Sequence, residues 1–129
     1  MLSPKIQLFN AVFSKSSALG YDTYDYLPGK DEDTPYPFVH VAESVGSDVI
    51  NNKDVINGRI SQTVHVWGIA NDRALFSDMV FKLEMELRRL SKLDNYYLRL
   101  LALDSNEMYD NTTTDTLLHG IIQVEYQLS

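Results

Sequence analysis

Three histidines are the side chains of this 129-residue sequence that are best suited to chemistry near neutral pH. His40, His65 and His119 each fall in a segment that we predict to be a strand, and none belongs to a two-histidine metal motif. A lone histidine in a strand is more often a packing or surface residue than a ligand, so we predict no metal site. Because the sequence contains no cysteine, thiolate chemistry, disulfides and cysteine-ligated metals are excluded.

Motifs for other kinds of catalysis do not occur in the sequence. It has no G-x-S-x-G elbow to expose a serine nucleophile, and its six glycines are scattered rather than gathered in a phosphate-binding loop. The acidic run Asp31-Glu32-Asp33 is typical of a solvated loop, and nothing predicts the burial that a general acid requires. We therefore predict a protein without catalysis or cofactors, and a hydrolase without a known motif is the catalytic alternative.

The net charge limits the possible partners. Eleven basic and eighteen acidic residues give a net charge of −7, which repels phosphate backbones and anionic lipids. Solubility alone is the simplest explanation of this charge. No stretch approaches the ~20 apolar residues of a membrane span, and Met1-Leu2-Ser3-Pro4-Lys5 does not resemble a signal peptide. We expect a soluble, unprocessed protein with no membrane partner.

Two segments have the period of amphipathic helices. In residues 5–19 the apolar positions are Ile6, Leu8, Phe9, Val12 and Phe13, while Gln7, Asn10 and Ser14 are expected to face water. In residues 71–93 an apolar stripe comprises Leu75, Phe76, Met79, Val80, Leu83, Leu87 and Leu90. Each helix needs a sheet or another helix to cover its apolar side.

The remaining segments predict strands and connections. Strands are expected at residues 21–26, 38–45, 59–69, 96–104 and 117–128, polar loops at 27–34 and 105–114, and a hairpin or loop at 46–58. Strands outnumber helices and hairpin connections dominate. We therefore predict one α+β domain over residues 1–129: a mostly antiparallel sheet, two helices packed on one face, and a protruding β-hairpin or loop.

Aromatic residues have two interpretations each. Trp67 is either a stacking platform for a ring or sugar, or an anchor between the sheet and a helix or neighbouring subunit, and we favour the anchor. Tyr21, Tyr24, Tyr26 and Tyr36 occur close together and are consistent with an interface or with ordinary strand packing.

Three motifs follow one another in a recognisable order. The first is Pro35-Tyr36-Pro37-Phe38-Val39-His40-Val41, and the second is Val64-His65-Val66-Trp67-Gly68, which precedes the long helix. The third runs from Leu117 to Tyr126 and includes His119-Gly120. In order, spacing and total length, residues 5–128 resemble the tail-completion, or head–tail joining, proteins of long-tailed bacteriophages, also called tail terminators. In this sequence, the positions that would match the structural motifs of that family are Pro35, Tyr36, Pro37, Phe38, Trp67, His119 and Gly120.

This resemblance implies a structural virion protein that forms a ring of six subunits. The ring would cap the tail tube and join it to the DNA-filled head, with no catalytic residue. Its partners would be copies of itself, the tail tube protein and a head–neck connector or stopper protein, and DNA would pass through the lumen without specific binding. The protein would be found at the head–tail interface of the virion, and in the host cytoplasm during assembly. An acidic lumen that repels DNA would then be a second explanation of the net charge.

The segment 46–58 is our candidate for contacts between subunits or with the tail tube. It is polar except for two apolar pairs, and the candidate interface residues are Val49, Ile50, Asn51, Asn52, Lys53, Asp54, Val55 and Ile56. The alternative function is a cytoplasmic protein-interaction or small-ligand-binding module without catalysis, which the aromatic-rich stretch 21–38 favours.

Overall fold

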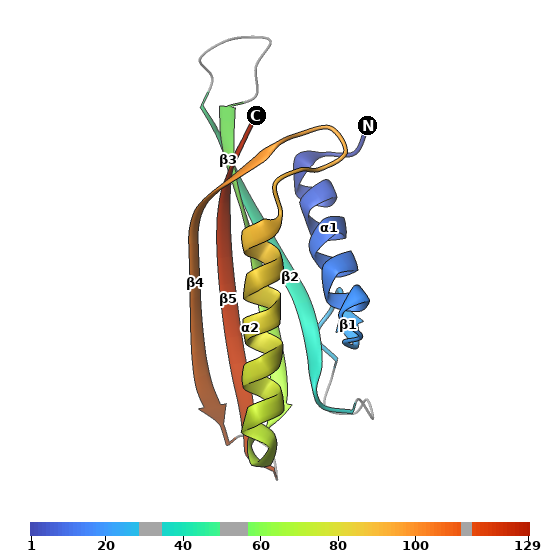
Figure 1. Cartoon of the computed structure of the whole chain (residues 1–129), viewed down its shortest axis with the longest axis vertical. Coiled ribbons are helices and arrows are strands. Elements are labelled where there is room, and N and C mark those ends of the chain that lie inside the picture. Colours follow the sequence, from blue (N-terminus) through green and yellow to red (C-terminus); the bar gives the residue numbers. More distant parts are fainter. Residues whose placement is uncertain (29–34, 50–56, 112–114) are drawn as a thin grey trace.

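The chain forms one five-stranded sheet with two helices on one face, as the computed structural model shows for residues 1–28, 35–49, 57–111 and 115–129 (Figure 1). In chain order the elements are α1 (Pro4–Ala18), β1 (Thr23–Tyr24), β2 (Phe38–Val49), β3 (Asn57–Ile69), a 3-10 turn (Ala70–Asp72), α2 (Arg73–Arg89), β4 (Leu98–Asp110) and β5 (Leu117–Leu128). The strand order is β1-β2-β3-β5-β4, and every pair is antiparallel except β1 with β2. The predicted α+β fold is confirmed.

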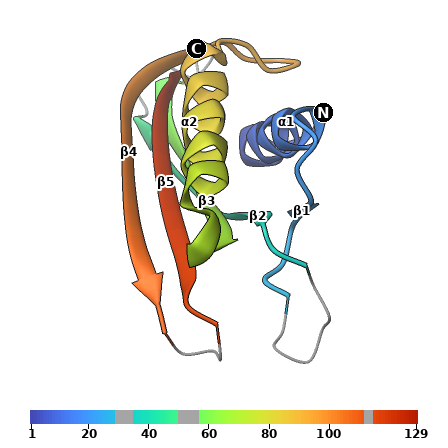
Figure 2. The same ribbon diagram turned by 60° about the horizontal axis from the view of Figure 1, so that its bottom comes forward.

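The helices do not cover the whole sheet. The long axis of α2 follows β3 and β5, and α1 lies on the β2 side, so much of β4 lies beyond both helices (Figures 1 and 2). The N- and C-terminal residues lie at the same end of the molecule (Figure 1). We call the sheet face without helices the open face.

Strand alternation places the core between the sheet and the helices, as predicted for β5. Leu118, Ile122, Val124, Tyr126 and Leu128 are all buried there. Between them lies Gly120, and a Cβ atom at that position would be 3.1 Å from the ring of Phe76 on α2. A Cβ on Gly68 of β3 would meet the same ring at 3.1 Å. The two glycines thus let Phe76 rest against bare backbone, and α2 approaches the sheet closely.

The first helix differs from the prediction in the face that it buries. Leu8 and Val12 are fully buried, but Ile6 is 47% exposed and Gln7 is buried. Gln7 was predicted to face water. Its amide instead bonds to Asn95 and to the carbonyl oxygen of Leu2, and these partners allow a polar side chain to be buried.

The second helix is shorter than predicted. It begins where the Asp72 carboxylate accepts a 3.3 Å hydrogen bond from the Leu75 amide, and it ends at Arg89 because Leu90 adopts an extended backbone. Leu90 and Leu93 remain buried beyond the helix. Leu75, which was assigned to the apolar stripe, is 42% exposed because it lies in the first turn, at the margin of the sheet.

Several strand boundaries were also wrong. Residues 105–110 form the second half of β4 rather than a loop, and they pair with residues 117–122 of β5. β2 continues to Val49 and β3 begins at Asn57, so part of the segment 46–58 is a hairpin stem. The predicted contacts of residues 50–56 and the acidic run Asp31-Glu32-Asp33 lie outside the described residues.

Candidate functional site

The three histidines, which lie far apart in the sequence, come together on the open face. His40 of β2 and His65 of β3 are cross-strand partners, with ring centroids 5.6 Å apart. His119 of β5 stacks on the other side of His65 at 5.0 Å. We call His40, His65 and His119 the histidine row. Each sits at an outward position of its strand, because the residues on either side point into the core.

Trp67 extends the row. Its ring and that of His119 are cross-strand neighbours, stacked with centroids 3.8 Å apart and planes 9° from parallel. Phe38 is the partner of Trp67 on β2, so three residues of the sequence motifs form one line across β2, β3 and β5. Trp67 therefore lies on the face opposite the helices and is not an anchor between sheet and helix; a contact with a subunit remains a prediction.

Burial keeps the histidine row neutral. The ring nitrogens Nδ1 of His65 and Nε2 of His119 are 2.8 Å apart, so one ring donates a hydrogen bond and the other accepts it. Burial, reinforced by repulsion from His65, lowers the pKa of His119 to about 4. Burial likewise lowers the pKa of His65 and, with repulsion from His65, that of His40, while Glu43 opposes both shifts.

The arrangement favours contact rather than catalysis. His65 and His119 use one nitrogen each on the other, and the described residues contain no group of three or more histidine, cysteine or carboxylate side chains placed to hold a metal ion. The indole nitrogen of Trp67 is buried and has no hydrogen-bond partner among the described residues. The result is a flat, stacked aromatic surface of the kind that is enriched at protein interfaces.

Between this line of aromatic rings and the β2–β3 hairpin stem, the open face becomes acidic. A depression of about 280 Å³ crosses β2, β3, β5 and β4, and carboxylates of Glu43, Asp104 and Glu125 line it. Only Glu125 has a cation beside it in the described structure, with Arg59 at 3.8 Å. This part of the open face therefore has a negative potential.

A buried glutamine shapes β2 next to this depression. Two residues of β2, Ala42 and Glu43, bulge opposite one residue of β3. The side-chain nitrogen of Gln62 donates to the carbonyl oxygens of Ala42 and Glu43 at 3.0 and 3.2 Å, and its oxygen accepts from Ser44 at 2.6 Å. Sequence reasoning missed Gln62. A polar residue between Ile60 and Val64 on the core face was the available signal.

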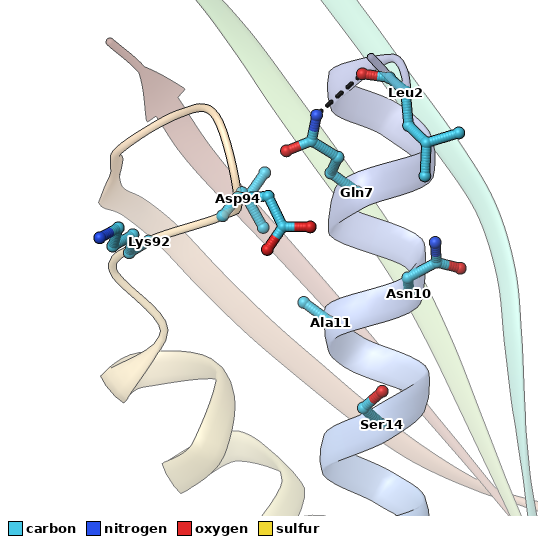
Figure 3. Close-up of a pocket in the computed structure, with 8 residues that line it drawn as sticks. Leu2, Gln7, Asn10, Ala11, Ser14, Lys92 and Asp94 are labelled. Atoms are coloured by element: carbon cyan, nitrogen blue, oxygen red, sulfur yellow. Dashed lines mark hydrogen bonds between the residues drawn. The ribbon is translucent and has the colours of Figure 1, made fainter.

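A second hollow lies between α1 and the loop after α2. It has a volume of about 490 Å³, and its lining includes Gln7, Asn10, Ser14, Lys92 and Asp94. Figure 3 shows Gln7 bonded to the carbonyl oxygen of Leu2 at the upper end of this groove. Since the remaining Gln7 groups bond to Asn95, this side chain joins α1 to the loop and has no polar group to spare for a ligand.

The predicted interface residues are only partly placed. Val49 ends β2, and residues 50–56 lie outside the described residues, so their contact role stays a prediction. Tyr36 lies at the start of the motif strand with its ring 5.3 Å from that of Phe38. Pro35 and Pro37 precede the strand as expected, and Gly120 faces the core, next to Phe76.

The fold defines an α+β protein with one helix-covered and one uncovered sheet face. Over nearly its whole length it is similar to a chain in the virion of the native gene transfer agent particle, with 12% sequence identity, a TM-score of 0.63, and coverage of 98% of this chain and 99% of the other. The bacteriophage SPP1 gp17 protein aligns over 95% of this chain and 91% of its own, at 21% identity and a TM-score of 0.48. No protein-family model and no curated protein sequence matches the chain. In the described part of the chain, no helix has the length and apolar character needed to cross a membrane.

Proposed function

We propose that this protein is a structural component of a phage or phage-like particle, where it forms a ring at the head–tail interface. The ring caps the tail tube and joins it to the DNA-filled head. The observation that carries the proposal is the full-length similarity in fold to a chain of a gene transfer agent virion. The order of the three sequence motifs is a second line of support, because it was read from the residues without the structural comparison.

The uncovered surfaces support assembly with other copies. The open face carries the histidine row and Trp67, and β4 is an edge strand whose second half is exposed. A sheet edge of this kind is an obvious template for another chain. Head-to-tail contacts close into a ring when the rotation between copies is a simple fraction of a turn.

The charge supports passage of DNA. Glu43, Asp104 and Glu125 make the part of the open face toward the β2–β3 hairpin stem acidic, and the whole chain carries −7. If this face lines the lumen, it repels the phosphate backbone and DNA slides through without binding. Neutralising Glu43 as glutamine should then slow DNA release without changing assembly.

Deleting the gene from the genome that encodes the protein tests the function directly. We expect electron micrographs of lysates to show DNA-filled heads and separate tails, and the wild-type gene supplied in trans to restore joined particles. A frameshift that leaves the neighbouring genes intact is the matched design, because it separates this protein's loss from polar effects. Normal numbers of joined, infectious particles would refute the proposal.

A small-ligand-binding module is the second candidate, because the groove beside α1 has a volume in the range of about 300–1,000 Å³ that ligand sites have. Thermal-shift measurements with panels of metabolites distinguish the two. A compound that raises the Tm of the wild type but not of a Ser14→Leu variant, which fills the groove, would favour this alternative. The ring function predicts no such compound.

A further inference from the structure

The two outer strands of the sheet leave much of their backbone without a strand partner. β4 is the last strand on one side. On the other side β1 covers β2 at Val39 and His40, and the described residues place no strand beside the rest of β2, from Val41 to Val49. Unpaired edges present rows of N–H and C=O groups, which readily pair with another chain.

In the second half of β4 the side chains are exposed to solvent on both faces of the sheet. Beyond the irregularity between Leu100 and Ala102, every side chain from Asp104 to Tyr109 is exposed, which means that both faces of this stretch are uncovered. Met108 and Tyr109 are 46% and 58% exposed. The stretch contains no proline or lysine, the residues that most often protect a sheet edge from pairing.

We propose that the outer edge of β4 pairs with the outer edge of β2 of a second copy of this chain, Ala102–Glu107 lying antiparallel to Ser44–Val49. Both segments are six regular residues that follow a bulge. The four long strands alternate in direction from β2 to β4, so the two edges run in opposite directions. Joining two copies in the same orientation therefore gives antiparallel pairing, the more stable kind.

Charge favours β2 over β4 as the partner edge. If β4 paired with β4 of another copy, Asp104 and Glu107 of both copies would be gathered along one seam, where like charges repel. β2 instead has a cation close by: the side chain of Lys5 reaches so near Gly46 that a Cβ there would be 2.9 Å from Lys5 Cε.

The pairing brings these charges together. With Ala102 opposite Val49, Ser105 lies opposite Gly46 and Glu107 lies opposite Ser44. Glu107 and Lys5 are then on the helix-bearing side of the joined sheet, about two residues apart along the strand. Lys5 and Glu107 form no ion pair with any described residue of their own copy, so both charges are available.

Closure of these contacts into a ring rests on the proposed function, but the strand contact itself does not. Engineered disulfides test it cleanly because the chain has no cysteine. In the proposed register Val45 of one copy lies opposite Asn106 of the next, and opposed residues of antiparallel strands are about 4.5–5.5 Å apart, within disulfide range. Within one copy they are on strands three spacings apart, about 14 Å, so no internal disulfide can form.

The experiment compares a Val45→Cys/Asn106→Cys variant with each single variant and with Val45→Cys/Ser77→Cys, in which the second cysteine is on the exposed side of α2. The purified proteins are oxidised at high concentration and resolved on non-reducing gels. We expect a ladder of covalent multimers from the first variant and a weak dimer at most from the others. Adding Ser105→Lys to the first variant should suppress the ladder at least tenfold, because an edge lysine opposes pairing.

Three outcomes would overturn the proposal: no ladder, an equal ladder from the Ser77→Cys control, or efficient dimers of Asn106→Cys alone, which would show that β4 pairs with itself. These outcomes are separable from failure of the proposed function. A ladder together with normal particles in the gene deletion leaves the strand contact standing and removes the ring at the head–tail interface. Separated heads and tails in the gene deletion, together with no ladder from the double-cysteine variant, would support the ring at the head–tail interface and remove the strand contact.

Discussion

The hydroxyl group of Tyr126 on β5 donates a 2.6 Å hydrogen bond to the carbonyl oxygen of Leu87 in the last turn of α2. The last four carbonyls of a helix have no partner within the helix, and this one is buried. Tyr126 is itself fully buried, and burial raises the pKa of its hydroxyl. One side chain therefore both fills the core and fixes the end of α2 over the sheet.

Replacing Tyr126 with phenylalanine should lower the free energy of unfolding by about 1–2 kcal/mol, since the Leu87 carbonyl would be left buried and unsatisfied. The matched control is Tyr109→Phe, which removes an exposed hydroxyl that accepts a hydrogen bond from Arg73, and it should change stability by less than about 0.5 kcal/mol. Urea unfolding measures both. Equal effects of the two substitutions would contradict this role of Tyr126.

Gln62→Leu should cost about 2–4 kcal/mol, because it leaves the Ala42 and Glu43 carbonyls of the β2 bulge without their donor. Gln123→Leu on β5 is the control, since Gln123 is exposed on the open face. We also expect faster hydrogen exchange at Ser44 in Gln62→Leu. Exchange as slow as in the wild type would mean that the bulge does not depend on the glutamine.

Gly120→Val should destabilise the fold by about 1–3 kcal/mol, because its side chain enters the space of Phe76 and Val80, which lie 3.1 and 3.2 Å from a Cβ at that position. Gly46→Ala should be milder, since the nearest atom there belongs to the flexible Lys5 side chain. In the double variant with Phe76→Leu, part of the cost should be recovered, with a coupling of about 1 kcal/mol. Strict additivity would show that the ring and the glycine do not oppose each other.

The histidine row predicts that stability falls at mildly acidic pH. The unfolded chain protonates His119 near its ordinary pKa of 6.5, whereas the folded chain does so only near 4. Between these values the unfolded state binds more protons, so the stabilisation is complete above about pH 6.5 and is lost as the pH falls toward 4. We expect a loss of about 1 kcal/mol, less than the full shift implies, because the ring is partly exposed to solvent.

Thermal unfolding from pH 4 to 7.5 measures this dependence. His119→Gln should flatten the curve between pH 6.5 and 4, while the remaining shifts at His40 and His65 keep a smaller slope in the same direction. A wild-type Tm that is constant across this range would contradict the assignment of neutral rings in the row.

Sequence patterns identified the parts of the fold that have one face exposed to solvent and one face buried in the core. β5 and the core face of β3 were found because their residues alternate between core and open face. The second half of β4 was missed because both of its faces are exposed, so its polar residues have no period to detect. Gln7 and Gln62 were misjudged or missed because their burial depends on partners distant in sequence, which no local pattern encodes.

The same limit applies to the candidate site. Each of His40, His65 and His119 was placed correctly in a strand, but their convergence depends on the strand order β2-β3-β5 and on registers that bring them level. Local spacing carries no information about either. The line formed by Phe38, Trp67 and His119 was expected only as separate motif positions.

The alternation of four long strands has a consequence for the shape of any assembly built through its edges. Copies added edge to edge in antiparallel fashion all point the same way. Every Val49 and Asn57 end of the β2–β3 stem is then at one rim, and the Asp110 end of β4 and the Leu117 end of β5 are at the other. The resulting ring of copies has two chemically different rims. Each rim can therefore bind a different partner. In a sheet of three or five alternating long strands the two edges run in the same direction. Such a chain would keep antiparallel pairing only if alternate copies were turned over, and the two rims would then be alike.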